Sequence, residues 1–480
     1  MMAILFRKLA IAAYIILLIP DLANSQDSHY ATQQFGSRST LMGGATVGYA
    51  RDNSSIFYNP GSLSFVDSNS ITLTANMYQM EHFRMENPTG AGENLVHSSV
   101  GSVPLMVGGM LGQGKNRFKI GYGVISPTNF SFNSTTRTEG IFPVVNEIES
   151  PGNEEFIGQS TKRSQLNEVV GILGFGYKLN QNWGIGLANM AMGRSQNFSQ
   201  NSYARFYLND SKNTLSTYSN GRELQFFHLR YGIKLGVCYR NKGFSAGFAF
   251  MPPTIGVAGS GSVASDVLGT NLWFENARQD VVANDRQQKL AIQYRSPFMV
   301  SAGLNWNRGR SSFGLAAQFH GRKPEYLIFD PAVSGFALPA KMYEQLGGRR
   351  FLQLKDGARP VFNFSFAYEY SLFRNLNLIA SFATNQTSYD TGLDSWQGLK
   401  TQISTWDLYH VRMGLTVKQG HSQLSLGLLY GFGNDPSRSV QGEFNVTDEN
   451  QLLNPAPSVT KAGYYSVGLL LGYSFLLFDI

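Results

Sequence analysis

The chain has 480 residues, of which 15% are charged and 13% are aromatic, and its formal net charge is +7. A soluble domain of average composition carries about 25% charged residues, so this composition argues against two or three ordinary soluble domains. The only cysteine is Cys238, so an internal disulfide bond cannot stabilise the fold.

The first residues have the pattern of a secretory signal peptide. Arg7 and Lys8 precede an apolar run at 9–19, and the tripeptide at 23–25 supplies the small residues that a signal peptidase accepts. We therefore expect residues 1–25 to be a cleaved signal peptide. The apolar run is too short to span a bilayer as a helix, and no apolar stretch of 18 or more residues follows it.

The next segment, residues 26–69, follows neither the helical nor the strand period, although many of its residues are apolar. Gly43 and Gly44 suit a close approach of the backbone to its neighbours, and Pro60 ends any helix near Tyr58. The glycines begin a GxxxxG pattern, but the Lys and Ser/Thr that a phosphate-binding loop requires do not follow it. We therefore expect no nucleotide site in this segment.

Segments in which polar and apolar residues alternate begin at residue 70. In HLRYGIKLGVCYR, residues 228–240, a face of Leu, Ile, Val and Tyr side chains opposes a polar face. Residues 409–417 and 465–477 alternate in the same way. Such strands are longer than the five to six residues of an average strand, and an aromatic-rich apolar face suits contact with lipid.

The alternating segments add up to about fourteen strands. We expect them at Ser70–Gln79, Ser102–Leu111, Arg117–Ile125, Leu166–Leu179, Asn182–Met192, Phe226–Arg240, Gly243–Met251, Pro297–Asn307, Ser311–His320, Val361–Ser371, Asn375–Thr384, Trp406–Lys418, Ser422–Phe432 and Ala462–Leu477. Turns of roughly two to four residues alternate with loops of roughly twenty to forty, as in outer-membrane barrels. The sequence thus predicts an all-β fold, a transmembrane antiparallel β-barrel over residues 70–480 with long extracellular loops.

A barrel of this size needs something besides wall side chains to fill it. Barrels of about eight strands are packed by their own side chains, whereas those of 16–18 strands leave an aqueous channel. Residues 26–69 precede the first strand on the periplasmic side and carry apolar groups that have no lipid to face. We expect them to fold up inside the lumen as an N-terminal hatch, or plug.

Residues 36–65 also resemble the N-terminal hatch of the FadL/TodX family of outer-membrane transporters for long-chain fatty acids and other hydrophobic compounds. In that family an MGGA segment is followed by the pattern D-x-S/A-x-x-x-x-N-P-A-G-L. Gly61-Ser62 replaces the Ala-Gly of this pattern here. The hatch residues that match it include Gly43, Gly44, Asp52, Asn59 and Pro60.

The resemblance implies passive, binding-driven uptake of hydrophobic or amphipathic small molecules, such as fatty acids or aromatic hydrocarbons, through a plugged barrel. In this family external loops capture the ligand, which binds inside the barrel and leaves after the hatch rearranges, in the best-known cases sideways near a kinked third strand. The corresponding place here is GYGVISPTNF, which contains Pro127. Because proline lacks a ladder donor, Pro127 either marks a lateral gate or merely ends the strand.

Polar strand faces carry a group of basic residues that we expect to point into the lumen. These candidate ligand-binding residues are Arg230, Lys234, His410 and Arg412. A ligand with a carboxylate would find partners among them. They would equally well neutralise the hatch, because structural ion-pair networks produce the same clusters.

The predicted external loops contain apolar residues that have neither lipid nor a core of their own. The candidates for ligand capture are Trp273, Phe274, Leu327, Phe329 and Phe336. Such side chains either form a capture groove or pack one loop against another.

The sequence contains no recognisable catalytic or metal-binding motif, so we expect neither an enzyme nor a cofactor or metal. A general diffusion porin is the main alternative, and an outer-membrane lipid-modifying enzyme is a second one. The expected partners are a hydrophobic or amphipathic ligand, outer-membrane lipid and the barrel assembly machinery, with no nucleic acid. The expected location is the outer membrane of a Gram-negative bacterium, and the family resemblance implies a monomer.

Overall fold

The computed structural model of the chain describes residues 27–66, 70–88, 94–111, 116–146, 148–274, 277–332, 335–338, 349–396, 398–441, 444, 448–452 and 457–476. The predicted signal peptide, residues 1–25, lies outside the described residues. Among the residues that are described, no helix is long and apolar enough to cross a membrane.

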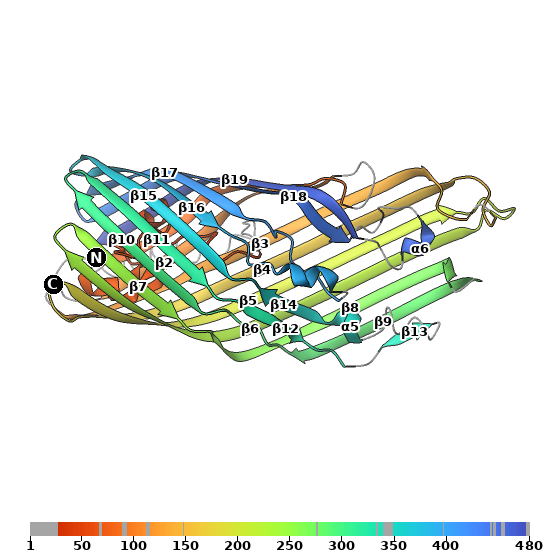
Figure 1. Ribbon diagram of the computed structural model, residues 1–480, viewed down its shortest axis with the longest axis horizontal. Helices are drawn as coiled ribbons and strands as arrows, with labels where there is room; N and C mark the ends of the chain where they lie inside the picture. The colour runs from red at the N-terminus through yellow and green to blue at the C-terminus, as the bar shows by residue number, and fades with distance from the viewer. Residues whose placement is uncertain are drawn as a thin grey trace, which may run out of the picture.

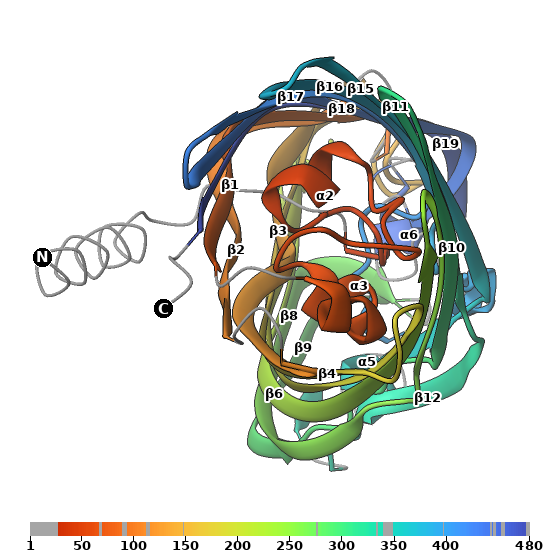
Figure 2. The same cartoon turned by 90° about the vertical axis from the view of Figure 1, so that its left-hand side faces the viewer.

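The described strands form a closed barrel of 14 antiparallel strands, seen end-on in Figure 2. The first and last strands close it by pairing from Ser70↔Leu476 to Met85↔Ala462. The wall strands are β1 (Ser70–Met85), β2 (Leu95–Leu111), β3 (Phe118–Phe142), β4 (Glu154–Lys178), β5 (Trp183–Tyr207), β6 (Leu215–Asn241), β7 (Phe244–Met251), β10 (Met299–Arg308), β11 (Ser311–His320), β15 (Val361–Phe373), β16 (Leu376–Asn385), β17 (Leu408–Gln419), β18 (Ser422–Gln441) and β19 (Pro457–Leu476). Each overlaps a predicted strand, so the predicted fold class and strand count are confirmed.

Alternation in the sequence becomes alternation of exposure in the wall. In β6, Leu235 is 50% exposed on the outer face, whereas its neighbour Lys234 is 2% exposed on the lumen side. In β17, Met413 is 61% exposed and Arg412 is 3% exposed. The outer face is therefore apolar and the inner face polar, which is the arrangement that a bilayer requires of a barrel.

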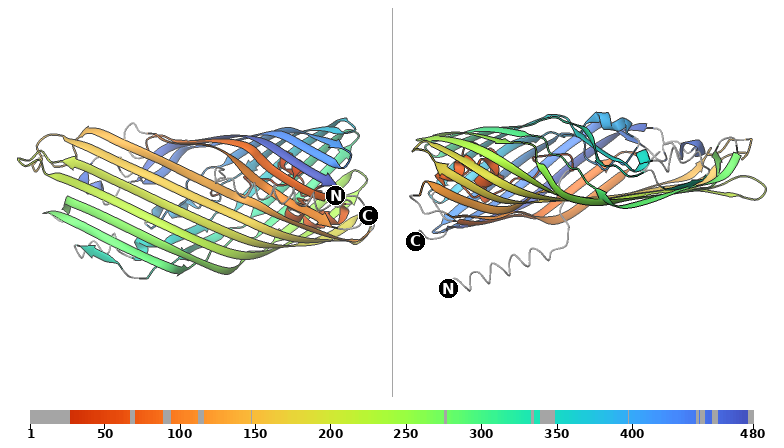
Figure 3. Two further views of the ribbon diagram at one scale, coloured as in Figure 1. Left: turned by 180° about the vertical axis from the view of Figure 1, so that it is seen from behind. Right: turned by 90° about the horizontal axis from the view of Figure 1, so that it is seen from below.

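Several strands are much longer than the sequence predicts. Strands β3, β4 and β5 have 25 residues each and β6 has 27, so that β4 begins at Glu154 rather than near Leu166. Figures 1 and 3 show these strands running far beyond the rest of the wall, away from the short turns. Outside a bilayer the two faces of a strand no longer differ in hydrophobicity, so the alternating pattern fades while the backbone ladder continues.

The external end of the wall carries additional strands. The hairpin of β8 (Ile255–Phe274) and β9 (Ala277–Ala291) extends the sheet from the outer half of β6, and β13 (Phe336–Leu338) pairs with β9. A separate two-stranded sheet consists of β12 (Lys323–Phe329) and β14 (Leu354–Ala358). The short helices at this end are α5 (Arg349–Leu352), η2 (Thr391–Ser395) and α6 (Glu449–Leu452).

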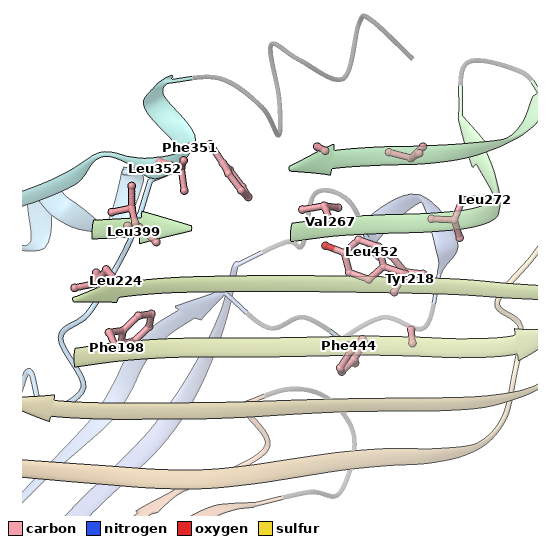
Figure 4. Packing of buried hydrophobic residues seen from close by; sticks show 14 of the residues in the cluster. Phe198, Tyr218, Leu224, Val267, Leu272, Phe351, Leu352, Leu399, Phe444 and Leu452 are labelled. Carbon is pink, nitrogen blue, oxygen red and sulfur yellow. The ribbon is translucent and has the colours of Figure 1, made fainter. Parts of the chain in front are cut away.

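These external elements enclose a hydrophobic core of their own. Phe198 and Leu224 of the long strands, Phe351 and Leu352 of α5, and Phe444 are buried in it (Figure 4). The long strands thus bury one face against the external loops.

The N-terminal segment, which we define as residues 27–66, lies within the ring of strands (Figure 2). It contains α2 (Ser37–Leu41), α3 (Ser55–Tyr58) and the 3₁₀ helix η1 (Pro60–Phe65). Helix α3 ends at Tyr58, as Pro60 predicts, and the Asn59 Oδ1 atom accepts a hydrogen bond from the Gly61 N–H at 2.9 Å. The segment is almost wholly buried, and the isolated β-bridge His29↔Thr387 joins it to a residue outside the wall strands.

Glycines of the wall make room for this segment. A Cβ atom on Gly186 would collide with the carbonyl group of Pro60, and one on Gly236 would collide with the Asn59 side chain. Similar collisions with the N-terminal segment would occur at Gly121, Gly174, Gly176, Gly184, Gly247, Gly303, Gly314, Gly414, Gly427 and Gly472. We call these twelve positions the glycine seat; they let the segment approach the wall more closely than any side chain would permit.

Candidate functional site

A cavity of about 190 Å³ lies between the N-terminal segment and the external loops. Its lining includes Phe57 and residues 27–31 of the N-terminal segment, and Ile328 and Asp356 of the external sheet. The barrel wall supplies the sides, chiefly from β4, β5, β6, β10 and β11. The cavity is thus enclosed by three parts of the chain that are far apart in the sequence.

Part of the cavity lining is apolar. This part consists of Leu166, Val170, Met190, Met192, Met251 and Met299. Methionine side chains are unbranched and polarisable, so a surface of this kind adapts to hydrocarbon groups of different shapes.

Cationic groups lie next to these residues, since Met192 pairs directly with Arg230 and Arg194 is the next inward-facing residue of β5. Glu168 forms an ion pair with Arg230, and its Oε2 atom lies 3.5 Å from Arg194 Nη1. The ring centroid of Tyr294 lies 4.1 Å from the Arg194 guanidinium and 4.7 Å from that of Arg230. The Nε–H groups of both arginines have no hydrogen-bond partner among the described residues. One carboxylate therefore faces two guanidinium groups that retain donors for an anion.

Next to this cluster lies a second ion pair, on the external sheet. Lys323 Nζ donates to Asp356 Oδ2 at 2.6 Å, and the Tyr326 hydroxyl donates to the same oxygen at 2.8 Å. Burial lowers the pKa of Lys323, but the Asp356 carboxylate more than offsets this effect and raises the pKa above its ordinary value. Lys323 therefore stays charged at neutral pH, and its charge is matched by Asp356.

The structure separates the four predicted lumen residues into two pairs. Arg230 and Lys234 line the cavity, and Lys234 Nζ donates to the Phe57 carbonyl oxygen of the N-terminal segment. Arg412 instead packs against Gly43, and His410 lies beside Asn385 with 3.4 Å between Nε2 and Nδ2. The polar strand faces indicate only that all four point inward, because the height of each residue in the lumen depends on strand register.

Two further cations, which the sequence does not single out, also line the cavity. Arg194 lies beyond Met192, where the predicted strand ends, and Lys323 lies in a predicted external loop. Residues 193–207 show no polar–apolar alternation in the sequence, so the local pattern does not extend the strand to Arg194, although burial alternates there in the structure.

The predicted hatch residues shape the N-terminal segment and fix it to the wall. Gly43 and Gly44 have φ angles of 62° and 80°, a region that favours glycine. Asp52 accepts hydrogen bonds from the Ser39 N–H at 3.3 Å and the Ser54 N–H at 3.1 Å. Asn59 Nδ2 donates both within the segment, to the Val47 oxygen at 2.9 Å, and to the wall, to the Val237 oxygen at 3.0 Å. Pro60 begins η1.

A buried ion pair also ties the segment to the wall, and the sequence does not identify it. Arg38 Nε lies 3.1 Å from Glu369 Oε2 of β15, and both side chains are buried. Asn377 Nδ2 donates to the other carboxylate oxygen at 3.0 Å. This pair joins two residues that are 331 positions apart in the chain.

Pro127 lies where the ladder between β2 and β3 stops. The pairing runs from Leu111↔Ile120 to Met106↔Ile125, and β3 also shifts register against β4 between Ile125 and Thr128. Farther out, the two strands are joined through side chains, as in the 2.9 Å hydrogen bond from Ser134 Oγ to the Val96 oxygen. Pro127 also lines the cavity, so the interruption lies beside it.

The candidates for ligand capture whose surroundings the structure describes differ from one another in exposure. Phe329 is 2% exposed in the external core, and Leu327 is partly buried in β12. The Trp273 N–H donates to Glu449 at 3.4 Å, and Phe274 is the last residue of β8. Phe336 is 55% exposed. Phe329 thus packs loop against loop, whereas Phe336 remains accessible.

Three solved structures illustrate the similarity of this chain to known proteins. A Pseudomonas aeruginosa FadL homologue has a TM-score of 0.59 at 12% identity, and the match covers 93% of this chain and 99% of that one. The Pseudomonas putida toluene transporter TodX has a TM-score of 0.57 at 14% identity, and the match covers 92% of this chain and 99% of that one. The Ralstonia pickettii toluene transporter TbuX has a TM-score of 0.54 at 11% identity, and the match covers 93% of this chain and 99% of that one.

No protein-family model and no curated protein sequence matches the chain. In each comparison the structural similarity extends over nearly the whole length of both chains. The sequence identities are so low that they establish the fold alone. The chain therefore has the fold of the FadL homologue and of the toluene transporters TodX and TbuX, a closed barrel of 14 antiparallel strands.

Proposed function

We propose that this protein is an outer-membrane transporter that takes up amphipathic molecules with a hydrocarbon part and an anionic head group. The observation that carries the proposal is the mixed lining of the cavity, in which methionine side chains lie beside the Arg194 and Arg230 guanidinium groups. The fold supports it, because proteins of the same fold include a FadL homologue and two toluene transporters. Catalysis is not part of the proposal.

The charges favour a carboxylate over a neutral hydrocarbon. Arg194 and Arg230 share Glu168, Lys323 is matched by Asp356, and Lys234 donates to a backbone oxygen rather than to a carboxylate. The side of the cavity near Tyr294 thus has an excess of positive charge, which a carboxylate would neutralise.

The route of passage follows from the position of the N-terminal segment. The glycine seat holds this segment across the lumen, so straight passage along the barrel axis would require the segment to leave the seat. The interrupted ladder at Pro127 offers a way sideways, from the cavity into the membrane. We propose that the ligand uses this lateral gate, with the N-terminal segment acting as a plug.

Binding to the purified protein tests the head-group assignment. Tritiated palmitate, hexadecanol and toluene would be compared by equilibrium dialysis in detergent, with the wild type and with Arg194→Gln. We expect palmitate to bind more tightly than hexadecanol, and Arg194→Gln to weaken palmitate about tenfold, since a hydrogen bond to a charged group contributes about 1.5–3 kcal/mol. Hexadecanol binding should not change. If Arg194→Gln leaves palmitate unaffected, the head-group site is wrong, and if none of the three binds, the transport proposal is wrong.

A general diffusion porin is the alternative, and conductance distinguishes it. In planar bilayers the intact protein should show little steady conductance, because the N-terminal segment fills the lumen at the glycine seat. Deletion of residues 31–63 should leave the barrel able to fold but open to ions. Equal and large conductance from both proteins would favour the porin.

A further inference from the structure

The barrel wall is interrupted at a second place, between β7 and β10. The five strands β3 to β7 separate it from the gap between β2 and β3. Strand β7 pairs with β10 as far as Met251↔Met299, and β8 pairs with β9 as far as Ser260↔Ala291. Between these ladders, residues 252–254 and 292–298 belong to no strand. The break contains Pro252, Pro253 and Pro297, none of which has an N–H group for a ladder.

A groove of about 540 Å³ lies at this break. Pro253, Val257, Ile292 and Phe298 make it largely apolar, while the exposed side chains of Arg295 and Arg322 also line it. The groove therefore offers both kinds of contact that an anionic amphiphile needs, hydrocarbon and cation.

The groove and the lumen cavity share part of their lining. The shared residues are Tyr294, Ser296, Pro297 and Lys323. Tyr294, Ser296 and Pro297 therefore lie between the wall groove and the cavity, in a segment that belongs to no strand. Backbone hydrogen bonds tie this segment to the external elements, from the Gln293 N–H to the Ile328 oxygen at 2.8 Å and from the Gly321 N–H to the Phe298 oxygen at 3.0 Å.

Contacts of side chains also hold this partition in place. The Thr254 and Ser296 hydroxyl oxygens lie 2.5 Å apart across the break. The Tyr294 ring is held among cations, with Arg194 at 4.1 Å and Lys323 at 5.0 Å from its centroid. The Arg295 N–H donates to the Tyr326 hydroxyl of the external sheet at 2.9 Å. Contacts of this kind break and re-form without disturbing the ladders on either side.

The break lies at a level where a membrane amphiphile would reach it. Pro252 follows the eight-residue strand β7, which begins at a short turn. At ~3.3 Å per residue and a tilt of about 40°, this places the break roughly 20 Å along the barrel axis, within an apolar band that is about 25 Å tall. Pro127 lies at nearly the same distance from the start of β3.

We infer that this break is a second lateral portal, through which an anionic amphiphile with an acyl chain passes between the outer leaflet and the lumen cavity when Tyr294 swings aside. The inference rests on the proposed transport function and adds to it a route separate from the gap at Pro127. The acyl chain would lie along Val257, Ile292 and Phe298, and the head group beside Arg295 or Arg322. Inside, Arg194 and Arg230 would receive the head group.

A reversible lock across the break tests the portal. In a Cys238→Ser background, Thr254→Cys and Ser296→Cys would be joined by a disulfide bond, and Ala246→Cys with Leu304→Cys, a directly opposed pair on β7 and β10, would serve as the matched control. We expect the lock to slow palmitate uptake by cells at least fivefold, with recovery on reduction, while palmitate binding in detergent stays unchanged. The control pair should have no effect. Wild-type uptake by the locked protein, with binding intact, would overturn the portal and leave the proposed function standing.

Changes at Tyr294 test the portal by opening it, whereas the disulfide bond closes it. Tyr294→Ala should speed palmitate uptake about twofold or more, whereas Tyr294→Phe keeps the ring between the cations and should behave as wild type. Equal rates for the alanine and phenylalanine variants would overturn the role of the ring as the gate.

The groove's occupant is identified by photolabelling. A benzophenone amino acid in place of Phe298 should become labelled with tritiated palmitate, and unlabelled palmitate but not added phospholipid should remove the label. Labelling by membrane lipid alone would overturn the portal in favour of a structural lipid groove. Absence of palmitate binding to the unlocked protein would instead refute both this inference and the proposed function.

Discussion

The carbonyl group of Pro60 occupies the space that a side chain on Gly186 would need. Pro60 begins η1 in the N-terminal segment, and Gly186 faces the lumen from β5. Their contact shows how the segment packs: because the wall has a glycine here, the backbone of the N-terminal segment can pack directly against the backbone of β5. At Gly176, Gly247, Gly303 and Gly314 of the glycine seat, backbone atoms of the segment occupy the space in the same way.

Enlarging this glycine should displace the N-terminal segment without preventing the barrel from folding. Overpacking by a methyl group costs about 1–3 kcal/mol, and at Gly186 this cost opposes docking of the segment, since the methyl group would meet Pro60. We expect Gly186→Ala to show channel openings in planar bilayers that the wild type lacks. Gly171→Ala is the control, since a Cβ atom there would meet nothing closer than 4.0 Å. Silent bilayers for both variants would argue against the seat.

The single cysteine reports whether the segment is docked. Cys238 is fully buried on the lumen side of β6, and its Sγ atom lies 3.4 Å from the Gly48 oxygen of the N-terminal segment. We expect a maleimide to react with it at least ten times more slowly in the native protein than in Gly186→Ala, because the thiol is accessible only after undocking. Mass spectrometry of the labelled protein measures this. Fast labelling of the wild type would mean that the segment leaves the wall readily.

Removing one partner of the Arg38–Glu369 pair should weaken docking strongly. Arg38→Met leaves the Glu369 carboxylate buried without its guanidinium partner, and such a change costs about 3–5 kcal/mol. The rate of Cys238 labelling should rise accordingly. Adding Glu369→Leu to Arg38→Met should restore much of the protection, since an apolar pair of similar volume is tolerated better than a lone buried charge. Additive effects of the two changes would contradict direct coupling.

Docking should also weaken in acid, through His29. Its Nε2 atom lies 2.8 Å from the Trp406 oxygen, and burial lowers its pKa to about 4 from an ordinary value of 6.5. The docked segment therefore favours neutral His29, so the stabilisation is complete above pH 6.5 and is lost as the pH falls toward 4. At pH 5 the loss is about 2 kcal/mol. Relative to a denatured sample labelled at the same pH, which corrects for the lower thiolate fraction in acid, Cys238 labelling should be faster at pH 5 than at pH 8, and His29→Gln should reduce this difference. An unchanged pH profile in His29→Gln would assign the effect to other groups.

The sequence by itself determined the barrel. The period of two in segments such as 228–240 separates lipid-facing from lumen-facing residues, and it yields the fourteen strands because a bilayer imposes that contrast on every strand that crosses it. The same contrast is missing outside the membrane, which is why the sequence does not predict strands over the outer halves of β3 to β6.

The tertiary structure alone decided which inward-facing residues meet. Arg230 and Arg412 look alike in the sequence, yet Arg230 lines the cavity with Arg194 whereas Arg412 packs against Gly43. Their heights in the lumen depend on strand register and on the path of the N-terminal segment, neither of which a local pattern records. The glycine seat and the break at residues 252–254 and 292–298 have the same origin, since each consists of residues from strands that meet only when the barrel closes.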